Sequence, residues 1–178
     1  MKIGIVIGSV RDVRTGPPIA EWVLENVSDR EGVDFEIVDL ASFDVPVYTS
    51  ATLPMMANKH YDSPAVQAWS EAIDSFDGYI FITPEYNHGV PGGLKNAVDS
   101  LGPEWVDKTI AFVSYGADSG VRAVEQWRQI VANFHMHDAR SQVALNLFID
   151  FNSEGFAPLE RRTAELTALV DDLVKITG

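Results

Sequence analysis

A polar segment at residues 8–16 carries the side chains best suited to binding an anion. It follows a short apolar run and precedes a stretch with helical periodicity, so it lies where a strand leads into a helix. The first turn of a helix presents free N–H groups and a partial positive charge, which together stabilise a phosphate. Ser9 and Thr15 add hydroxyl donors, and Arg11 adds a guanidinium that grips phosphate oxygens in pairs. Arg14 either does the same or points to solvent. An ordinary turn with surface arginines is the alternative.

Two well-known nucleotide-binding patterns are absent from this segment. The GxxxxGK[ST] pattern fails because no Gly-Lys pair follows Gly8 at the required distance, and the GxGxxG pattern fails because position 10 is Val10. A loop rich in hydroxyls and arginine suits a terminal monophosphate better than a bridging pyrophosphate. Gly8 and Gly16 allow the backbone to come close to such a ligand.

A second segment, residues 83–99, has the composition of a rigid loop that reads the edge of a flat, uncharged ring. Its prolines, among them Pro84, stiffen the backbone, and its glycines permit tight turns. Asn87 offers both a hydrogen-bond donor and an acceptor, while Tyr86 and His88 can flank a ring face or edge. We expect the backbone of this loop to make most of the contacts.

Residues 84–99, which read PEYNHGVPGGLKNAVD, resemble the signature of the NADPH-dependent FMN reductase family. That family includes flavodoxin-like quinone, azo-dye and chromate reductases. The Gly-Ser-Val-Arg of residues 8–11 is similar to the family's phosphate loop, and residues 114–120 are similar to its third flavin loop. Residues 12–17 depart from the family pattern, in which a serine often follows the arginine. The second phosphate ligand therefore stays open between Arg14 and Thr15.

The resemblance implies an enzyme with bound FMN that takes a hydride from NADPH or NADH and passes electrons to a small acceptor. Quinones, azo compounds, metal oxyanions and free flavin are the acceptor classes it implies. Because the flavin carries the chemistry, the resemblance implies no catalytic side chain. It also implies a homodimer or homotetramer. The implied cofactor-binding residues are Ser9, Arg11, Arg14, Thr15, Gly16, Pro84, Glu85, Tyr86, Asn87, His88, Ser114, Gly116 and Ala117.

The elements that must position these loops follow from apolar periodicity, which alternates five times between a strand and a helix. Near-continuous apolar strands predict a parallel sheet covered on both faces. We therefore expect one α/β domain over residues 1–178, a flavodoxin-like three-layer sandwich with a five-stranded parallel sheet in the order 2-1-3-4-5. The expected strands are residues 3–7, 35–40, 79–82, 110–113 and 143–149. Apolar stripes at helical spacing over residues 19–27, 66–76, 94–101, 124–134 and 166–173 indicate the expected helices, the first two of which open at the prolines of residues 17–18 and 64.

Local signals support the helix starts and leave one segment open. Ser63 precedes a helix that opens with a proline, and Thr15 or Gly16 precedes another. Residues 41–61 show no clear period and follow the carboxyl end of the second strand, where ligands bind in open α/β sheets. We interpret that segment either as a lid or subunit contact, or as a passive excursion. Trp105, in a connection, shapes a pocket or a subunit contact.

Composition excludes several function classes. The chain has no cysteine, which rules out disulfides, thiolate nucleophiles and Cys-ligated metal centres. A net charge of −13 disfavours nucleic acid and anionic membranes, because phosphate binding depends on Lys and Arg. His135 and His137 lack further metal ligands, so we expect no metal site. The apolar run near the N-terminus is too short for a signal sequence, and we expect a cytoplasmic protein.

Three other functions compete with this interpretation. An electron carrier of the flavodoxin type would suit the acidic charge, since carriers often dock on basic partners. A binding or regulatory module without flavin is compatible with the same fold. A reductase that treats FMN as a substrate is the third. The sequence does not distinguish NADPH from NADH.

Overall fold

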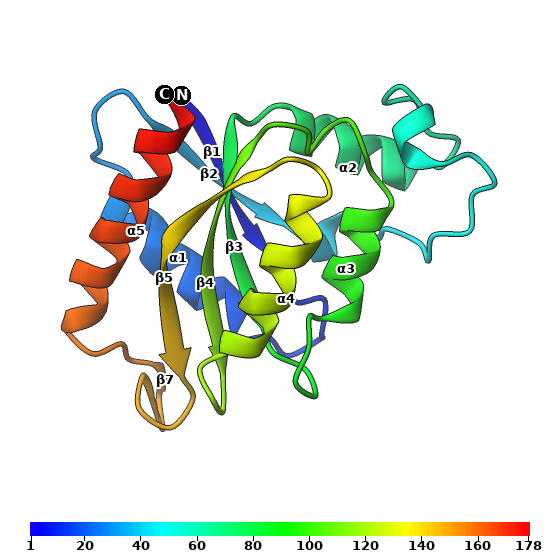
Figure 1. Ribbon diagram of the computed structural model, residues 1–178. Coiled ribbons are helices and arrows are strands. Elements are labelled where there is room, and N and C mark those ends of the chain that lie inside the picture. The colour runs from blue at the N-terminus through cyan, green and yellow to red at the C-terminus, as the bar shows by residue number, and fades with distance from the viewer.

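A five-stranded parallel sheet forms the centre of the computed structural model, which describes residues 1–178 (Figure 1). The strands are β1 (Lys2–Ile7), β2 (Asp34–Asp39), β3 (Gly78–Pro84), β4 (Thr109–Gly116) and β5 (His137–Asn146). Their order is β2-β1-β3-β4-β5, which confirms the predicted order. Every residue of β3 and β4 is buried, because helices cover both faces of the sheet.

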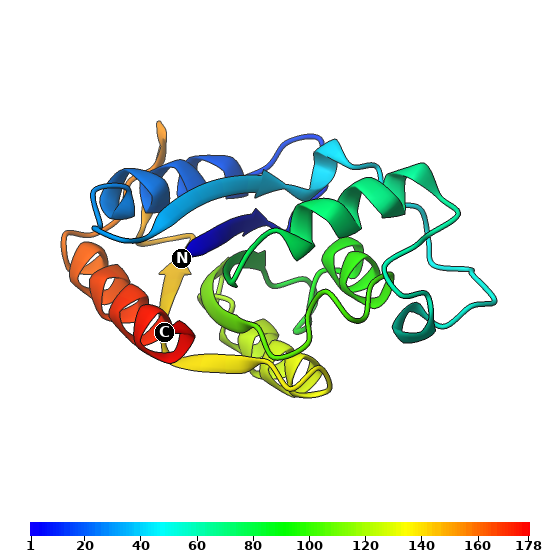
Figure 2. The same cartoon turned by 90° about the horizontal axis from the view of Figure 1, so that it is seen from above.

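Five helices form the two outer layers, as the view along the sheet in Figure 2 shows. They are α1 (Gly16–Val27), α2 (Pro64–Asp74), α3 (Gly92–Asp99), α4 (Val121–Ala132) and α5 (Arg161–Thr177). One apolar cluster of 20 buried residues lies between the sheet and α1 and α5. A second cluster, of 21 buried residues, lies under α2, α3 and α4. The two clusters are of nearly equal size, so both faces of the sheet are held by apolar packing.

The predicted helix starts are confirmed, with one difference in chemistry. The Ser63 side chain accepts a hydrogen bond from the N–H of Val66 and caps α2, whose first residue is a proline. Thr15 precedes α1 in the same way, but its side chain makes no capping bond. The Thr15 hydroxyl therefore stays free for another partner.

The prediction for the fifth strand was wrong at both ends. β5 begins at His137 and ends at Asn146, whereas the apolar pattern predicted residues 143–149. β5 is an edge strand, so its early residues alternate between exposed and buried instead of forming an apolar run. Residues 147–149 are apolar but lie exposed in the turn after the strand. A short hairpin that the sequence did not predict follows them, with strands β6 (Phe151–Asn152) and β7 (Gly155–Phe156).

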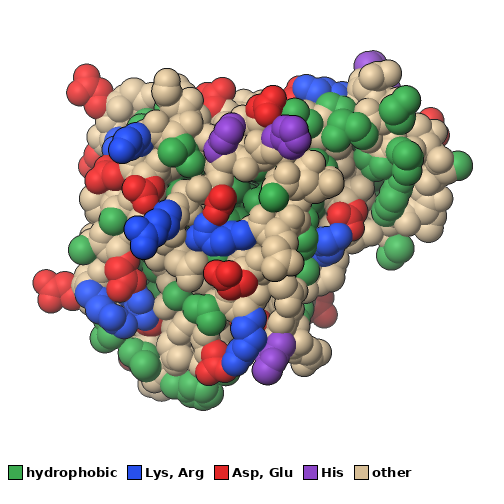
Figure 3. Space-filling model, viewed as in Figure 1, with side chains coloured by type: hydrophobic (Ala, Val, Ile, Leu, Met, Phe, Trp, Pro, Cys, Tyr) green, Lys and Arg blue, Asp and Glu red, His purple; other side chains and the backbone are tan.

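Residues 41–61 run beside α2 and α3 and project from that side of the molecule (Figure 1). Their regular structure is two 3-10 turns, η1 (Leu40–Ser42) and η2 (Pro54–Met56). Asn96 of α3 holds the segment, since it accepts from the N–H of Tyr48 and donates to the carbonyl of Pro46, both at 2.9 Å. Figure 3 shows apolar side chains gathered on this projecting part. The exposed apolar side chains of the segment are Val47, Leu53, Met55 and Met56.

Three of the four tryptophans lie in the core. Trp69 and Trp127 are fully buried, and Trp22 is half-buried and makes a T-shaped contact with Phe156. Trp105 is also fully buried and donates to the carbonyl of Val98 at 3.1 Å, so it belongs to the core and not to a pocket or a subunit contact. None of the helices has the length and apolar character that crossing a membrane requires.

Candidate functional site

Three loops meet at the carboxyl edge of the sheet because the central strands end at the same level. In the register of the sheet, Ile7 pairs with Ile82, and Thr83 pairs with Ser114. The loops that follow these strands are therefore neighbours. They are residues 8–15 after β1, residues 85–91 after β3 and residues 117–120 after β4, and the last two form the lower edge of Figure 1. We call these the first, second and third loops.

The first loop offers a cradle of backbone donors. The N–H groups of residues 9–15 donate to no acceptor within the chain. Arg11 is exposed and takes part in no ion pair. The Thr15 hydroxyl is free of capping, as described above. Unused N–H groups, a free guanidinium and a hydroxyl at the start of α1 form a donor set that fits a phosphate.

Arg14 occupies a position that the sequence did not predict. Its Nη1 and Nη2 lie 2.5 Å and 2.8 Å from the two carboxylate oxygens of Asp39, at the end of β2. Nη1 also donates to the carbonyl of Ser9 at 3.1 Å. The hydrogen-bonded pair raises the pKa of Arg14 and lowers the pKa of Asp39. Arg14 is thus turned neither to solvent nor toward the free donors of the first loop.

Two tyrosines join the first loop to the others. The Tyr86 hydroxyl lies 3.0 Å from Ser9 Oγ, which places the second loop against the first. The Tyr115 hydroxyl lies beside Gly16, where a Cβ would approach it to 3.4 Å. Burial raises the pKa of Tyr115, so this group stays a neutral hydroxyl at the edge of the cradle. Tyr115 lies within residues 114–120, which resemble the family's third flavin loop, but it was not among the implied binding residues.

The second loop turns sharply between Tyr86 and Gly89. These two residues exchange backbone hydrogen bonds of 3.0 Å and 3.1 Å. Asn87 and His88 between them have φ values of 50° and 66°, so the turn has the type I′ form. Both residues are exposed, and their N–H groups donate to no acceptor within the chain. The tip of the turn therefore presents two backbone donors beside the first loop, as expected for a loop that reads a ring edge.

Side chains of α4 hold the second loop. Gln126 donates to the carbonyl of His88 at 2.8 Å and accepts from the N–H of Val90 at 3.2 Å. The Glu85 carboxylate accepts from the backbone N–H and the guanidinium of Arg122, at 3.0 Å and 2.6 Å, and its side chain is 8% exposed. Glu85 therefore positions the loop and is not free to act as an acid or base. No sequence signal pointed to Gln126, because its partners are backbone groups 36 and 38 residues away.

The third loop is shaped by two residues in the left-handed region. Ser119 and Gly120 have φ values of 63° and 72°, and a Cβ on Gly120 would lie 2.9 Å from the N atom of Tyr115. Only glycine fits that close approach. The hydroxyl of Ser114 is buried and donates to the carbonyl of Ser119 at 2.7 Å. Ser114 therefore supports the third loop from the interior. It is one of the implied binding residues, but its side chain is buried under the loop.

The turn after β5 is fastened directly to the third loop. Asn146 donates from its side chain to the carbonyl of Ala117 at 2.7 Å, and the N–H of Leu147 donates to the carbonyl of Gly116 at 3.1 Å. The N–H of Ala117 itself donates to no acceptor within the chain. The carboxyl edge thus combines unused backbone donors from all three loops. It extends to the exposed apolar residues 147–149, among them Phe148 at 80% exposure.

Several known proteins are similar to this chain in sequence. Residues 1–150 match the family described as NADPH-dependent FMN reductase. The NAD(P)H-dependent FMN reductase ntnL of Nectria sp is 43% identical over 129 residues, which is 70% of this chain and 64% of that protein. The chain therefore spans less than two thirds of the length of ntnL. An NAD(P)H:quinone oxidoreductase of Solanum tuberosum is 29% identical over 182 residues, covering 96% of this chain and 89% of that protein.

A solved structure shares the fold over nearly the whole chain. It is FerB, a flavoenzyme NAD(P)H:(acceptor) oxidoreductase from Paracoccus denitrificans. The two superpose with a TM-score of 0.76 over 98% of this chain and 97% of FerB, at 19% sequence identity. At that identity the likeness concerns the fold alone.

Proposed function

The chain belongs to the NADPH-dependent FMN reductase family, and we propose that it binds FMN at the three loops and passes hydride electrons from NADPH or NADH to a small acceptor. The observation that carries this proposal is the set of unused N–H groups of residues 9–15 beside the free guanidinium of Arg11. That set suits the terminal phosphate of a mononucleotide. The second and third loops add unused backbone donors at the same edge of the sheet.

The residues would divide the work as follows. Arg11, the Thr15 hydroxyl and the N–H groups of the first loop would bind the phosphate. The N–H groups of Asn87, His88 and Ala117 would donate to the ring and stabilise the negative charge that it acquires. When bound, the flavin supplies the hydride chemistry. Glu85 is engaged by Arg122 and is therefore not free to act as a general acid or base.

The absorbance spectrum of the purified protein tests this function. We expect a flavin band near roughly 450 nm, since that band belongs to the oxidised cofactor. Adding NADPH or NADH without air should bleach the band, and adding a quinone should restore it. A flavin band that NAD(P)H leaves unchanged would indicate an electron carrier. A colourless protein that does not take up FMN would contradict the proposal.

The apolar turn after β5 supports a planar organic acceptor. Leu147, Phe148 and Ile149 are exposed. Their turn is held by a backbone hydrogen bond from Leu147 to Gly116 at the end of β4 and by the Asn146 side chain on Ala117 of the third loop. An aromatic side chain fixed at the rim of a flavin site offers a surface on which a quinone ring can pack. The quinone oxidoreductase named above is a relative of this chain. We infer that quinones are better acceptors here than small ions.

Steady-state kinetics with two acceptors test that inference. Phe148→Ala should raise the KM for a hydrophobic quinone about fivefold and leave the KM for ferricyanide unchanged, because only the quinone has a ring to pack. Ile176→Ala serves as the matched control, since Ile176 is also exposed but lies in the last turn of α5, at the opposite edge of the sheet. Equal changes with both acceptors would rule out a role for Phe148 in choosing the acceptor.

We propose that residues 41–61 form a subunit contact. Their exposed apolar side chains project beside α2 and α3, and exposed apolar patches often mark interfaces. Light scattering should show a dimer or tetramer for the wild type and a smaller species for the double variant Leu53→Asp with Met56→Asp. A monomeric wild type, or an oligomer that survives both substitutions, would contradict this assignment.

A further inference from the structure

We propose that Asp39 is a positioning residue for the cofactor phosphate, acting through Arg14 to fix the shape of the first loop. This inference rests on the proposed function, because it assumes that the first loop holds the FMN phosphate. It assigns Arg14 a role other than direct phosphate binding, and it assigns a role to Asp39, which lies outside all three loops.

The geometry of the Arg14–Asp39 pair is that of a clamp. The guanidinium donates to both carboxylate oxygens, a fork-to-fork arrangement that fixes orientation as well as distance. Asp39 is the last residue of β2 and pairs in register with Ile7, the last residue of β1. The carboxylate therefore sits on the rigid sheet, level with the point where the first loop begins. The pair is only partly accessible, with side-chain exposures of 18% for Arg14 and 30% for Asp39.

The clamp acts on the backbone of the loop through one carbonyl. Arg14 Nη1 donates to the carbonyl of Ser9 at 3.1 Å, so this oxygen is held on the side of the guanidinium. The peptide unit is planar and trans, so the N–H of Val10 in the same unit points in the opposite direction. Fixing Ser9 O thus fixes the direction of a donor in the cradle. The Asp39 carboxylate also accepts a hydrogen bond from the N–H of Ala41, which fixes the carboxylate at the end of β2.

The charges of Arg14 and Arg11 suit these two residues to different tasks. The positive charge of Arg14 is compensated by Asp39, and both ends of its guanidinium are engaged. Arg11 in the same loop is exposed and has no acidic partner. A phosphate would therefore meet the charge of Arg11 and the geometry set by Arg14. Arg14 lies within residues 12–17, the part of the first loop that departs from the family pattern.

Flavin titrations of the protein stripped of its cofactor test the inference. FMN and riboflavin share the ring and the ribityl chain, but riboflavin has no phosphate. Asp39→Asn should weaken FMN binding about tenfold, which corresponds to roughly 1.4 kcal/mol, and should change riboflavin binding by less than about twofold. Arg14→Gln should have the same selective effect. Asp138→Asn is the matched control, because it breaks a partly exposed Asp–Arg pair with Arg128 at the far edge of the sheet.

Each outcome decides a separate point. Tighter FMN binding in Asp39→Asn would overturn the inference, because it would mean that Asp39 restrains a direct phosphate ligand. An equal loss for FMN and riboflavin, or no loss, would also overturn it, since neither depends on the phosphate. If the wild type bound neither flavin, the proposed function itself would fail. Should Asp39→Asn prove unstable in a thermal melt, Arg14→Gln carries the same comparison.

Discussion

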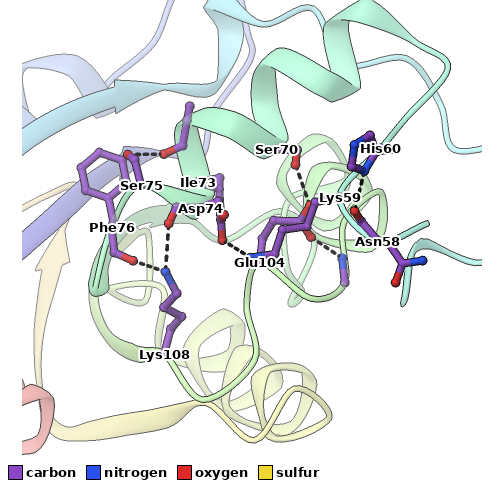
Figure 4. A network of polar contacts seen from close by, with 12 residues as sticks. Asn58, Lys59, His60, Ser70, Ile73, Asp74, Ser75, Phe76, Glu104 and Lys108 are labelled. Atoms are coloured by element: carbon purple, nitrogen blue, oxygen red, sulfur yellow. Dashed lines mark hydrogen bonds and ion pairs between the residues drawn. The ribbon is translucent and has the colours of Figure 1, made fainter. Parts of the chain in front are cut away.

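Replacing Glu104 by glutamine tests how a buried carboxylate holds the end of the projecting segment. Glu104 is fully buried and accepts from the hydroxyl of Ser70 at 2.6 Å and from the N–H of Gly102 at 3.0 Å. The hydroxyl of Tyr61, the last residue of that segment, lies 2.9 Å and 3.1 Å from its two oxygens. Figure 4 shows Glu104 directed at Ser70 of α2. The carboxylate therefore joins residues 41–61, α2 and the connection that follows α3.

The expected loss of stability in Glu104→Gln follows from the number of acceptor oxygens at residue 104. A glutamine amide keeps one oxygen and replaces the other by an NH₂ group that cannot accept. In either orientation one hydrogen bond to a charged oxygen is lost: the N–H of Gly102 faces the NH₂ group, or the Ser70 hydroxyl must turn round to accept from it. Losing one hydrogen bond to a charged group costs about 1.5–3 kcal/mol. For a chain of this size each kcal/mol lowers Tm by about 2–4 °C, so Glu104→Gln should lower Tm by roughly 3–12 °C.

Thermal unfolding followed by circular dichroism measures this shift, with the wild type and the variant in the same flavin state. Glu125→Gln, an exposed glutamate on α4, should leave Tm unchanged. Tyr61→Phe removes one donor and leaves the carboxylate with two, so its loss should be smaller. An unchanged or raised Tm in Glu104→Gln would refute the reasoning. It would mean that relief from burying a charge outweighs the lost hydrogen bonds.

Three further predictions concern the loops and the turn after β5. Gly120→Ala forces a Cβ against the backbone of β4 at positive φ, so it should cost about 2–3 kcal/mol in urea unfolding and reduce the bound flavin. Arg11→Ala should raise the Kd for FMN about tenfold and leave riboflavin binding unchanged, with Arg140→Ala as the baseline. Burial tends to raise the pKa of Asp150, but hydrogen bonds from Arg162 and from backbone N–H groups outweigh it and lower that pKa. The stability that ionised Asp150 contributes is therefore present above its usual pKa of 3.8 and is lost as the pH falls below that value, so Asp150→Asn should flatten the decline in stability below about pH 4.

The order of the sheet could be predicted because each central strand is an apolar run, and segments with helical periodicity separate one run from the next. A residue on β3 or β4 is buried on either face, so its apolar character does not depend on contacts elsewhere. The edge strand β5 differs from the central strands because part of it is exposed to solvent. Its exposed face allows polar residues such as Arg140, which interrupt the run, while the apolar Phe148 follows the strand in a turn. Apolar character alone cannot separate these two cases.

Some residues of the candidate site could be predicted from the sequence, and others could not. Ser9, Arg11 and the turn at Asn87 lie within short segments whose composition already indicates their chemistry. Asp39 and Gln126 do not, because each acts on a loop that is distant in sequence, with Asp39 placed 25 residues from Arg14. Their roles depend on the register of the sheet and on the packing of α4. A single sequence contains no local pattern that announces such a contact.

The distant side chains share one physical task. A site lined by backbone N–H groups selects a ligand only if its peptide planes are fixed before the ligand arrives, since a loop that must be ordered on binding loses affinity. Each loop meets this requirement through side chains outside its own tip. Arg14 holds the carbonyl of Ser9, Gln126 holds the carbonyl of His88, and Asn146 holds the carbonyl of Ala117. In each case a side chain holds a carbonyl and with it the plane of the peptide unit, and in two of these units the following N–H, of Val10 or Asp118, donates to no acceptor within the chain. Substitutions at these three holders should therefore weaken flavin binding although none of them provides a ligand atom.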